Sequence, residues 1–371
     1  MEALHGIRPV LVHDWLTGMR GGEKCLAPFC RLWRNASLYT LLHKVGKVSE
    51  EIERLQPRTS FLQTLPMVER YYRYLLPIMP LAANWRLPKC DLVLSFSHCV
   101  AKAAAPAAGV SHVCYCFTPM RYAWHLRESY FTSWKRLAVQ PLLARLREWD
   151  RATAERVTQF VAISRTVQQR IRECYGRESI VIHPPVDTDF YTPANEARED
   201  FYLCVSACAP YKRLDLAVQG CNRMKRRLII IGSGQDERRI RAQAGPTVQI
   251  LGWQPDEVIR DHLRRCRALL FPGEEDFGIV PLEALACGTP VIAFGRGGAT
   301  ETLSGIGSFF AEQNVECLIE ALEEFERQED GFDPSAARKR ALQFRTGRYV
   351  QEMLDYLRIV LGRETKMPLA A

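Results

Sequence analysis

The chain has 371 residues, of which 47% are hydrophobic and 25% are charged, and its formal net charge is +8. This length exceeds one ordinary hydrophobic core, and the composition excludes disordered and fibrous proteins. No apolar run is long enough to cross a bilayer and the opening residues lack the features of a secretory signal, so we expect a cytoplasmic protein. The thirteen cysteines show no C-x-x-C spacing, which favours reduced, buried thiols over disulfides or zinc.

The positive charge is concentrated in the first half of the chain. Residues 1–190 hold 26 Lys and Arg against 16 Asp and Glu, whereas residues 191–371 hold 24 against 26. No nucleic-acid-binding motif accompanies this excess, and a modest positive balance is poor evidence for such a partner. We therefore expect no nucleic acid.

Apolar runs and helical stretches alternate along the first half. The pattern predicts strands over residues 8–15, 91–97, 111–117, 159–164 and 180–185, with helices over 23–33 and 165–175. Such alternation is typical of parallel βαβ units. The first loop carries Gly18, Gly21 and Gly22, which either let the backbone approach a ligand or only form a turn.

Residues 67–87 mix aromatic and basic side chains. Tyrosines and leucines alternate there with Arg70, Arg73 and Arg86. One interpretation is contact with an anionic membrane surface, and the other is packing on the protein itself with the arginines reaching solvent. Pro77 and Pro80 exclude one long amphipathic helix.

Two segments that follow strands of the first half carry candidate functional residues. His98 comes directly after the strand 91–97, where it either packs and caps or acts in catalysis. The strand 111–117 leads into Arg121, Tyr122 and Trp124.

The second half repeats the alternation. The pattern predicts strands over 201–207, 227–234, 248–252, 267–272 and 291–294, and helices over 214–224, 236–243, 256–266, 280–288 and 348–363. Residues 186–200 are polar and Pro-interrupted and are the expected linker. We predict domains at 1–192 and 193–347, with 348–371 crossing back to the first. The GSG at 232–234 is only part of a dinucleotide fingerprint, which argues against a nicotinamide enzyme.

The residues after the strand 267–272 combine two carboxylates with a helix start. Glu275 and Glu283 lie eight positions apart around the Phe277-Gly278 turn, so both can reach one ligand beside unbonded amide groups. Lys212 and Arg213 precede another helix and can neutralise a diphosphate.

These motifs resemble those of a known family. The pattern E-x7-E within FG-x-x-x-x-E-A-x-A-x-G-T-P-V-I-A resembles the donor-binding signature of glycosyltransferase family 4, retaining enzymes of the GT-B architecture. HDWLTGMRGGEK, SHVCYCFTPMRYAWHL and IHPPVDTDF are similar to the WbaZ-like subgroup of polysaccharide and O-antigen mannosyltransferases. The chain departs from the pattern at Phe117 (His in relatives), at His125 (Asp) and at Ser206-Ala207-Cys208, where the family has an arginine.

The resemblance implies an α/β GT-B fold, with two Rossmann-like domains facing a central cleft and a C-terminal helix crossing back. It implies transfer of mannose from GDP-mannose to a lipid-linked oligosaccharide acceptor, for cell-surface polysaccharide synthesis. The enzyme would be peripheral on the inner face of the cytoplasmic membrane and would need neither a metal nor a cofactor.

The resemblance also assigns roles to residues. Glu283 would hold the ribose hydroxyls, Glu275 would contact the donor sugar, and Lys212 with Arg213 would hold the diphosphate. The remaining assignments are the amides of Phe277, Gly278 and Ile279 for sugar orientation, Gly21 and Gly22 for the floor of the cleft, and His98, Arg121, Tyr122 and Trp124 for the acceptor side.

Three alternatives stay open. The changes at Phe117 and Ala207 are compatible with a catalytically weak sugar-nucleotide-binding subunit of a glycan assembly complex. A nucleotide-sugar epimerase of the same architecture is the second alternative, and a transferase that uses a UDP-sugar is the third.

Overall fold

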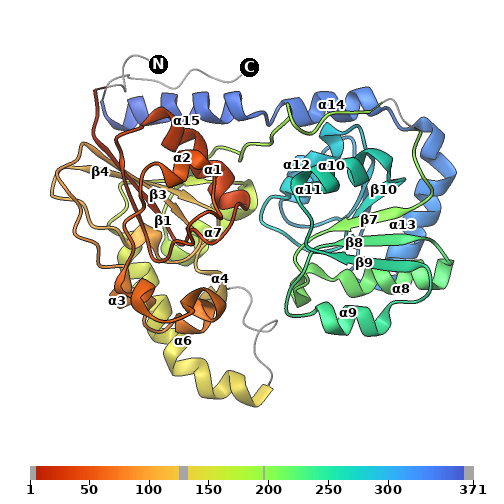
Figure 1. The fold of residues 1–371 in the computed structure, drawn as a ribbon, viewed down its shortest axis with the longest axis horizontal. Helices are drawn as coiled ribbons and strands as arrows, with labels where there is room; N and C mark the ends of the chain where they lie inside the picture. Colours follow the sequence, from red (N-terminus) through yellow and green to blue (C-terminus); the bar gives the residue numbers. More distant parts are fainter. Residues whose placement is uncertain (1–5, 125–132, 195–196, 363–371) are drawn as a thin grey trace. The chain divides into compact units, whose positions relative to one another are not determined.

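The computed structural model describes residues 6–124, 133–194 and 197–362, and it divides into two compact units (Figure 1). Unit 1 comprises residues 1–185 and 347–371, and unit 2 comprises residues 186–346. The predicted boundary after residue 192 lies seven residues beyond the observed one.

Unit 1 is built on a six-stranded sheet in the order β2-β1-β3-β4-β5-β6. Every neighbouring pair is parallel. The strands are β1 Pro9–His13, β2 Ser37–Thr40, β3 Leu92–Ser97, β4 Ser111–Cys116, β5 Gln159–Ala162 and β6 Ser179–Val181. All residues of β1 and β3 are buried, which explains why these strands are continuous apolar runs rather than alternating ones.

Helices connect the strands of unit 1. They are α1 Gly21–Leu32, α2 Glu50–Glu53, α3 Met79–Ala82, α4 Arg121–Trp124, α6 Ser133–Ala154 and α7 Arg165–Tyr175, with 3-10 turns η2 Phe61–Thr64, η3 Val68–Arg70, η4 Tyr72–Leu75 and η5 Ala101–Ala103. Local signals set the limits of α7, because the Ser164 hydroxyl accepts from the Val167 N–H and Gly176 ends the helix at a φ of 65°.

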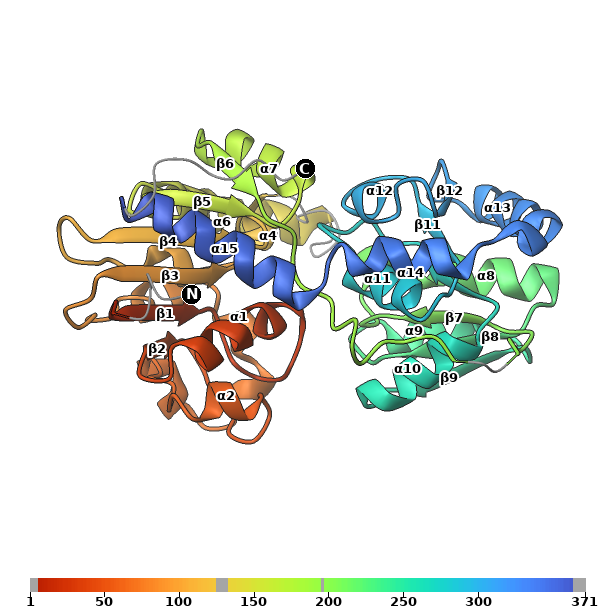
Figure 2. The same ribbon diagram turned by 90° about the horizontal axis from the view of Figure 1, so that it is seen from above.

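The last helix, α15 Thr346–Val360, packs on unit 1 (Figures 1 and 2). The Tyr349 hydroxyl donates to the Cys25 carbonyl at 3.2 Å, and its ring meets Phe29 and Tyr115 edge to face. The Tyr356 hydroxyl donates to Gln159 on β5. The expected return of the C-terminal helix to the first domain is confirmed.

Unit 2 has a second parallel sheet in the order β12-β11-β10-β7-β8-β9. Its strands are β7 Tyr202–Val205, β8 Leu228–Ile231, β9 Val248–Gly252, β10 Ala268–Phe271, β11 Val291–Phe294 and β12 Ser308–Phe310. Its helices are α8 Leu214–Met224, α9 Glu237–Gln243, α10 Asp256–Arg265, α11 Ile279–Ala286, α12 Ala299–Thr302, α13 Val315–Gln328 and α14 Pro334–Leu342, with 3-10 turns η6 Pro210–Lys212 and η7 Glu329–Gly331. Two parallel α/β units of this kind confirm the predicted fold class.

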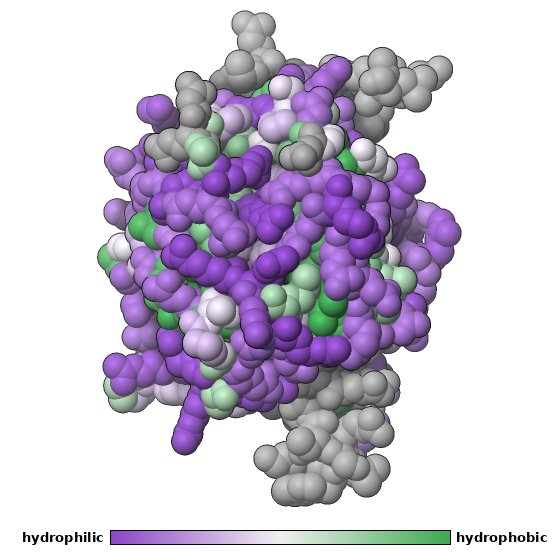
Figure 3. Space-filling view, turned by 90° about the vertical axis from the view of Figure 1, so that its right-hand side faces the viewer, coloured by the Kyte–Doolittle hydropathy of each residue, from purple (hydrophilic) through white to green (hydrophobic). Residues whose placement is uncertain are grey.

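Among the described residues, no helix has the length and apolar character needed to cross a membrane. On the face shown in Figure 3, hydrophilic residues predominate.

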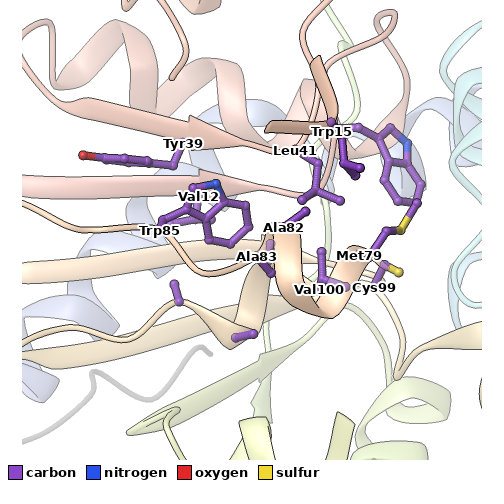
Figure 4. Packing of buried hydrophobic residues seen from close by; sticks show 14 of the residues in the cluster. Val12, Trp15, Tyr39, Leu41, Met79, Ala82, Ala83, Trp85, Cys99 and Val100 are labelled. Atoms are coloured by element: carbon purple, nitrogen blue, oxygen red, sulfur yellow. The ribbon is translucent and has the colours of Figure 1, made fainter. Parts of the chain in front are cut away.

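The aromatic and basic segment 67–87 contributes to the core of unit 1. Tyr72, Met79 and Trp85 are buried in one cluster with Trp15 and Tyr39, and Figure 4 shows Met79 on α3 beneath the Trp15 ring. Burying side chains of this size stabilises the fold by about 2 kcal/mol each. The packing interpretation therefore holds for one face of the segment, while Arg70, Arg73 and Arg86 stay exposed.

Candidate active site

The sheet of unit 2 has a topological switch point between β7 and β10. From β7 the chain proceeds to β8 and β9 on one side, and it then crosses to β10, β11 and β12 on the other. The loops that follow β7 and β10 therefore begin side by side at the carboxyl ends of the strands, the edge at which ligands of open α/β sheets bind.

Glycines bring the loops at this edge into backbone contact. A Cβ on Gly297 would lie 2.4 Å from the Glu275 carbonyl, and one on Gly298 would lie 2.3 Å from the Cα of Phe277. The Gly298 N–H donates to the Glu275 carbonyl at 2.7 Å. A Cβ on Gly273 would lie 3.0 Å from the Cα of Lys212. The loops after β10 and β11 are thus adjacent, and the first of them also touches the loop after β7.

Lys212 and Glu275 form an ion pair across the switch point. Lys212 ends η6 after β7, and Glu275 lies in the loop after β10. Their side chains are 13% and 23% exposed, so the pair is shielded but remains open to a ligand. The ammonium also lies 5.2 Å from the centre of the Tyr211 ring.

Arg213 is directed elsewhere within unit 2. Its guanidinium pairs with Asp215 at 3.2 Å and donates to the Gln313 carbonyl at 3.3 Å. Its backbone has a φ of 50°, a left-handed conformation that costs a non-glycine residue about 1 kcal/mol. Of the two predicted cations, Lys212 is the one that faces Glu275.

Glu283 is buried inside α11 with 6% exposure. Burial raises the pKa of the Tyr191 hydroxyl, and the neighbouring Glu283 carboxylate raises it further. Gly278, at a φ of 98°, permits the turn that begins α11. The ring of Phe277 packs edge to face on Phe344, which fixes the turn from the side of α14.

The sheet of unit 1 has its own switch point, between β1 and β3. Asp14 follows β1 and is fully buried, and His98 follows β3. The Asp14 carboxylate accepts backbone N–H groups from four consecutive residues, His98 to Ala101, at 2.6 to 3.0 Å. It also lies 3.0 Å from Nδ1 of the His98 ring.

These contacts fix both the charge of Asp14 and the orientation of His98. Burial acts to raise the pKa of Asp14, but the charge and hydrogen bonds of His98 outweigh it, and the pKa falls to about 2. The His98 ring stands edge to face on Trp15 with centroids 4.4 Å apart, and its side chain is 29% exposed. With Nδ1 held by Asp14, Nε2 is the ring nitrogen left for a ligand.

Gly22, in the first turn of α1, lies against a second histidine. A Cβ on Gly22 would lie 3.0 Å from Nε2 of His13 and 3.4 Å from Phe117. His13 Nδ1 bonds to the Trp15 carbonyl at 2.9 Å, and burial lowers the pKa of His13, so the ring is neutral and Nε2 is an acceptor. This buried Nε2 has no hydrogen-bond partner among the described residues.

Trp124 is anchored within unit 1. Its indole N–H donates to Asp150 at 2.8 Å, and the Tyr175 hydroxyl donates to the same oxygen. The other oxygen of Asp150 pairs with Lys102 at 2.6 Å, and both of these side chains are buried. The sequence reading missed this pair, although a lysine in an otherwise apolar run after a strand is a usable signal. Arg121 and Tyr122 are half-buried on α4, and His125 lies outside the described residues.

The cysteines are free, and all but Cys317 are buried, as the lack of C-x-x-C spacing indicated. Among the described residues no group of His, Cys, Asp and Glu has the arrangement of a metal site.

Two family models match the chain. Residues 187–342 match the model for glycosyl transferases group 1, and residues 40–190 match the model for Glycosyltransferase Family 4.

Two curated relatives are mannosyltransferases. A GDP-mannose-dependent alpha-(1-6)-phosphatidylinositol monomannoside mannosyltransferase of Mycolicibacterium smegmatis is 28% identical over 172 residues, which are 38% of this chain and 45% of that protein. An alpha-1,3/1,6-mannosyltransferase of Homo sapiens is 30% identical over 142 residues, 32% of this chain and 36% of that protein. The chain spans less than half the length of these two relatives.

Solved structures show the same fold. HepE of Anabaena, in complex with UDP, is similar with a TM-score of 0.72 at 17% identity, over 94% of this chain and 99% of that one. Sucrose-phosphate synthase of Thermosynechococcus elongatus has a TM-score of 0.73 at 14% identity, over 96% of this chain and 100% of that one. The expected GT-B architecture is thereby confirmed.

Proposed function

Because the chain carries a glycosyl transferases group 1 domain and a Glycosyltransferase Family 4 domain, we propose that it is a retaining glycosyltransferase. Its donor would be GDP-mannose and its acceptor a lipid-linked oligosaccharide. The names of the mycobacterial and human relatives support mannose as the sugar.

The observation that carries the proposal is the Lys212–Glu275 ion pair at the switch point of unit 2. Without a ligand the two charges satisfy each other. A donor diphosphate would take over Lys212, and the released Glu275 would then accept hydrogen bonds from the sugar hydroxyls. The site thus exchanges an internal pair for two contacts with the donor.

In the proposed reaction the bond from the anomeric carbon to the phosphate oxygen breaks and a bond to the acceptor oxygen forms on the same face. The acceptor proton passes to the departing diphosphate. Lys212 would stabilise the charge that develops on that diphosphate, which is where an electrostatic contact accelerates the step most. No metal is required in this scheme.

The other predicted residues are assigned the following roles in donor and acceptor binding. Glu283 would hold the ribose, the amides at the start of α11 would orient the sugar, and Arg213 would assist from its place beside Asp215. On unit 1, Gly21 and Gly22 would admit the ligand next to His13, and His98 would hold the acceptor hydroxyl through Nε2. Arg121 and Tyr122 would contact the acceptor glycan, with Trp124 fixing α4 beneath them.

A UDP-sugar is the second candidate donor, because HepE is similar in fold and was solved with UDP. A screen of donor turnover with GDP-mannose, UDP-glucose, UDP-galactose and UDP-GlcNAc decides between them. We expect GDP-mannose to be turned over fastest. Preference for any UDP-sugar would overturn the mannose assignment and leave the glycosyltransferase assignment in place.

Ala207 is exposed and stands where the resemblance calls for arginine. The lack of this cation is compatible with a second candidate function, a catalytically weak sugar-nucleotide-binding subunit. Calorimetric titration with GDP-mannose, followed by a turnover assay, separates the cases. Binding without transfer to any acceptor supports a non-catalytic subunit, and release of a free epimerised sugar supports an epimerase.

A lipid-linked acceptor would place the enzyme on the inner face of the cytoplasmic membrane. The +10 excess of charge in residues 1–190 supports attachment to anionic lipid, which is peripheral and weakens as salt is raised.

A further inference from the structure

Unit 1 has a cationic pocket that is formed in part by the segment 67–87. Its volume is about 250 Å³, and its lining residues are Thr17, Arg20, Lys44, Glu69, Arg70, Tyr72 and Arg73. A water molecule occupies about 30 Å³ of the liquid, so this space corresponds to roughly eight waters.

The pocket holds more positive charge than the protein neutralises. Four cations face the single carboxylate of Glu69. Arg73 lies over the Tyr72 ring at 5.6 Å. Within the described residues, the side chains of Arg20, Lys44 and Arg70 make no ion pair. An anion that enters would therefore gain charge-assisted hydrogen bonds without having to break internal ones.

Tyr72 supplies an independent observation that points to a ligand. It is 4% exposed and packs its ring on Trp15 with centroids 5.2 Å apart, so its position is fixed. Its hydroxyl is buried and has no hydrogen-bond partner in the described structure. A buried hydroxyl without a partner is unfavourable, and Tyr72 is one of the residues that line the pocket.

The part of the chain that forms the pocket also exposes apolar side chains. The described residues include eleven exposed large hydrophobic side chains, and seven of these lie between residues 19 and 81, which make up less than a fifth of the chain. The seven are Met19, Val45, Phe61, Met67, Tyr74, Ile78 and Leu81. Met19, Val45 and Tyr74 each directly adjoin a pocket cation in the sequence. Exposed apolar side chains grouped in this way are typical of a surface that meets lipid.

From the pocket, its unmatched charge and the exposed apolar side chains in the same part of the chain, we propose that unit 1 binds the phosphate headgroup of a membrane lipid. The cations and the Tyr72 hydroxyl contact a phosphomonoester or diphosphate, and the flanking side chains enter the acyl region. Identification of this lipid with the carrier of the acceptor glycan rests on the proposed function, whereas headgroup binding itself does not.

Vesicle co-sedimentation without any donor tests the proposal. We compare phosphatidylcholine vesicles that contain phosphatidic acid with vesicles that contain phosphatidylserine at equal surface charge. The protein should bind the phosphomonoester vesicles at least about tenfold more tightly, and inorganic pyrophosphate should compete. Equal binding to both vesicles, or no competition by pyrophosphate, would show that only diffuse charge attracts the protein.

Matched variants locate the effect. Lys44→Gln with Arg70→Gln should abolish the preference for phosphatidic acid, whereas Arg86→Gln with Lys89→Gln removes equal charge outside the pocket and should keep it. Tyr72→Phe retains the ring packing and should weaken the preference several-fold. The proposal fails if both double variants lose the preference to the same extent, or if Tyr72→Phe leaves it unchanged.

One further double variant separates the sources of phosphate. Tyr74→Ser with Leu81→Ser should weaken vesicle binding without altering competition by pyrophosphate. If this variant binds vesicles as tightly as the wild type does, the ligand is a soluble phosphate and the lipid assignment falls. Donor turnover is measured on the same preparations, so failure of the proposed function is visible independently of headgroup binding.

Discussion

Each unit has a carboxylate at the switch point of its sheet, but the two carboxylates differ in burial and in the number of their hydrogen-bonding partners. Asp14 of unit 1 is fully buried and has five hydrogen-bonding partners inside the protein. Glu275 of unit 2 is partly exposed and forms its ion pair with Lys212. The first carboxylate is saturated and holds the shape of its site, whereas we propose that the second exchanges its partner for a ligand.

Replacing the two carboxylates should separate these roles most strongly. Asp14→Asn removes the ionised acceptor of buried N–H groups, and we expect the free energy of unfolding to fall by about 3 kcal/mol or more. Glu275→Gln should lower it less, because this carboxylate is partly exposed whereas Asp14 is fully buried, and should mainly slow transfer. Urea unfolding measures the free energy of unfolding of both variants. Equal decreases would show that the two carboxylates do not differ in their structural role.

The same carboxylate gives the wild type a specific acid sensitivity. The pKa of Asp14 is lowered to about 2 in the folded protein, below the unfolded value of about 4. Its stabilisation is therefore complete above pH of about 4 and is lost as the pH falls toward 2. Asp14→Asn should remove that part of the acid dependence, seen as a flatter curve of unfolding free energy against pH.

Lys212→Ala should lower turnover on the order of a hundredfold while the fold stays intact, because the charge it balances develops in the transition state. Arg213→Ala should cost several-fold less, since Asp215 and Gln313 hold its guanidinium. Steady-state kinetics with donor and acceptor measure both. Equal losses would show that Arg213 turns toward the diphosphate when the donor binds.

Glu283→Ala should weaken donor binding by about 2 to 3 kcal/mol, the scale of a charge-assisted hydrogen bond in a closed site. Titration calorimetry gives the affinity. Tyr191→Phe is the control, because it removes only the hydroxyl that neighbours Glu283. Unchanged donor affinity in Glu283→Ala would restrict this carboxylate to packing with Tyr191.

On unit 1, His98→Gln should lower transfer by about tenfold or more and leave donor affinity unchanged, since a positioned imidazole contributes to the chemical step. The outcome that contradicts this role is normal transfer, which would reduce His98 to a partner of Asp14.

The smallest expected effect is an increase in turnover. Ala207→Arg restores the cation that the resemblance calls for at an exposed position beside the switch point, and turnover should rise by a few-fold. No gain would mean that Lys212 already suffices, or that Arg296, which stacks over Phe294, supplies the charge.

The sequence was sufficient for most of the strands, because parallel strands buried on both faces read as apolar runs. It missed β2 and β12, which have four and three residues and lie at the sheet edges. It also missed the helices α6 and α14. It missed α13 as well, although Leu318, Leu322 and Phe325 follow a helical period and Asn314 caps its start.

For the site, the motif placed Lys212 and Glu275 near one ligand but did not reveal that they pair. The motif also could not show that Asp14 accepts hydrogen bonds from four backbone N–H groups, because these bonds join residues that are 84 to 87 positions apart in the sequence. Spacing reports local geometry, whereas such contacts depend on which strands become neighbours.

The return of α15 to unit 1 also orders the events of synthesis. Residues 186–346 form a continuous segment and can complete their sheet as soon as they leave the ribosome. Unit 1 begins earlier but finishes later, because its surface at Cys25, Phe29 and Tyr115 stays uncovered until Tyr349 has been added. A nascent chain interrupted before α15 would therefore display this apolar surface to chaperones and proteases, although nearly all the residues of both sheets' cores had already been made.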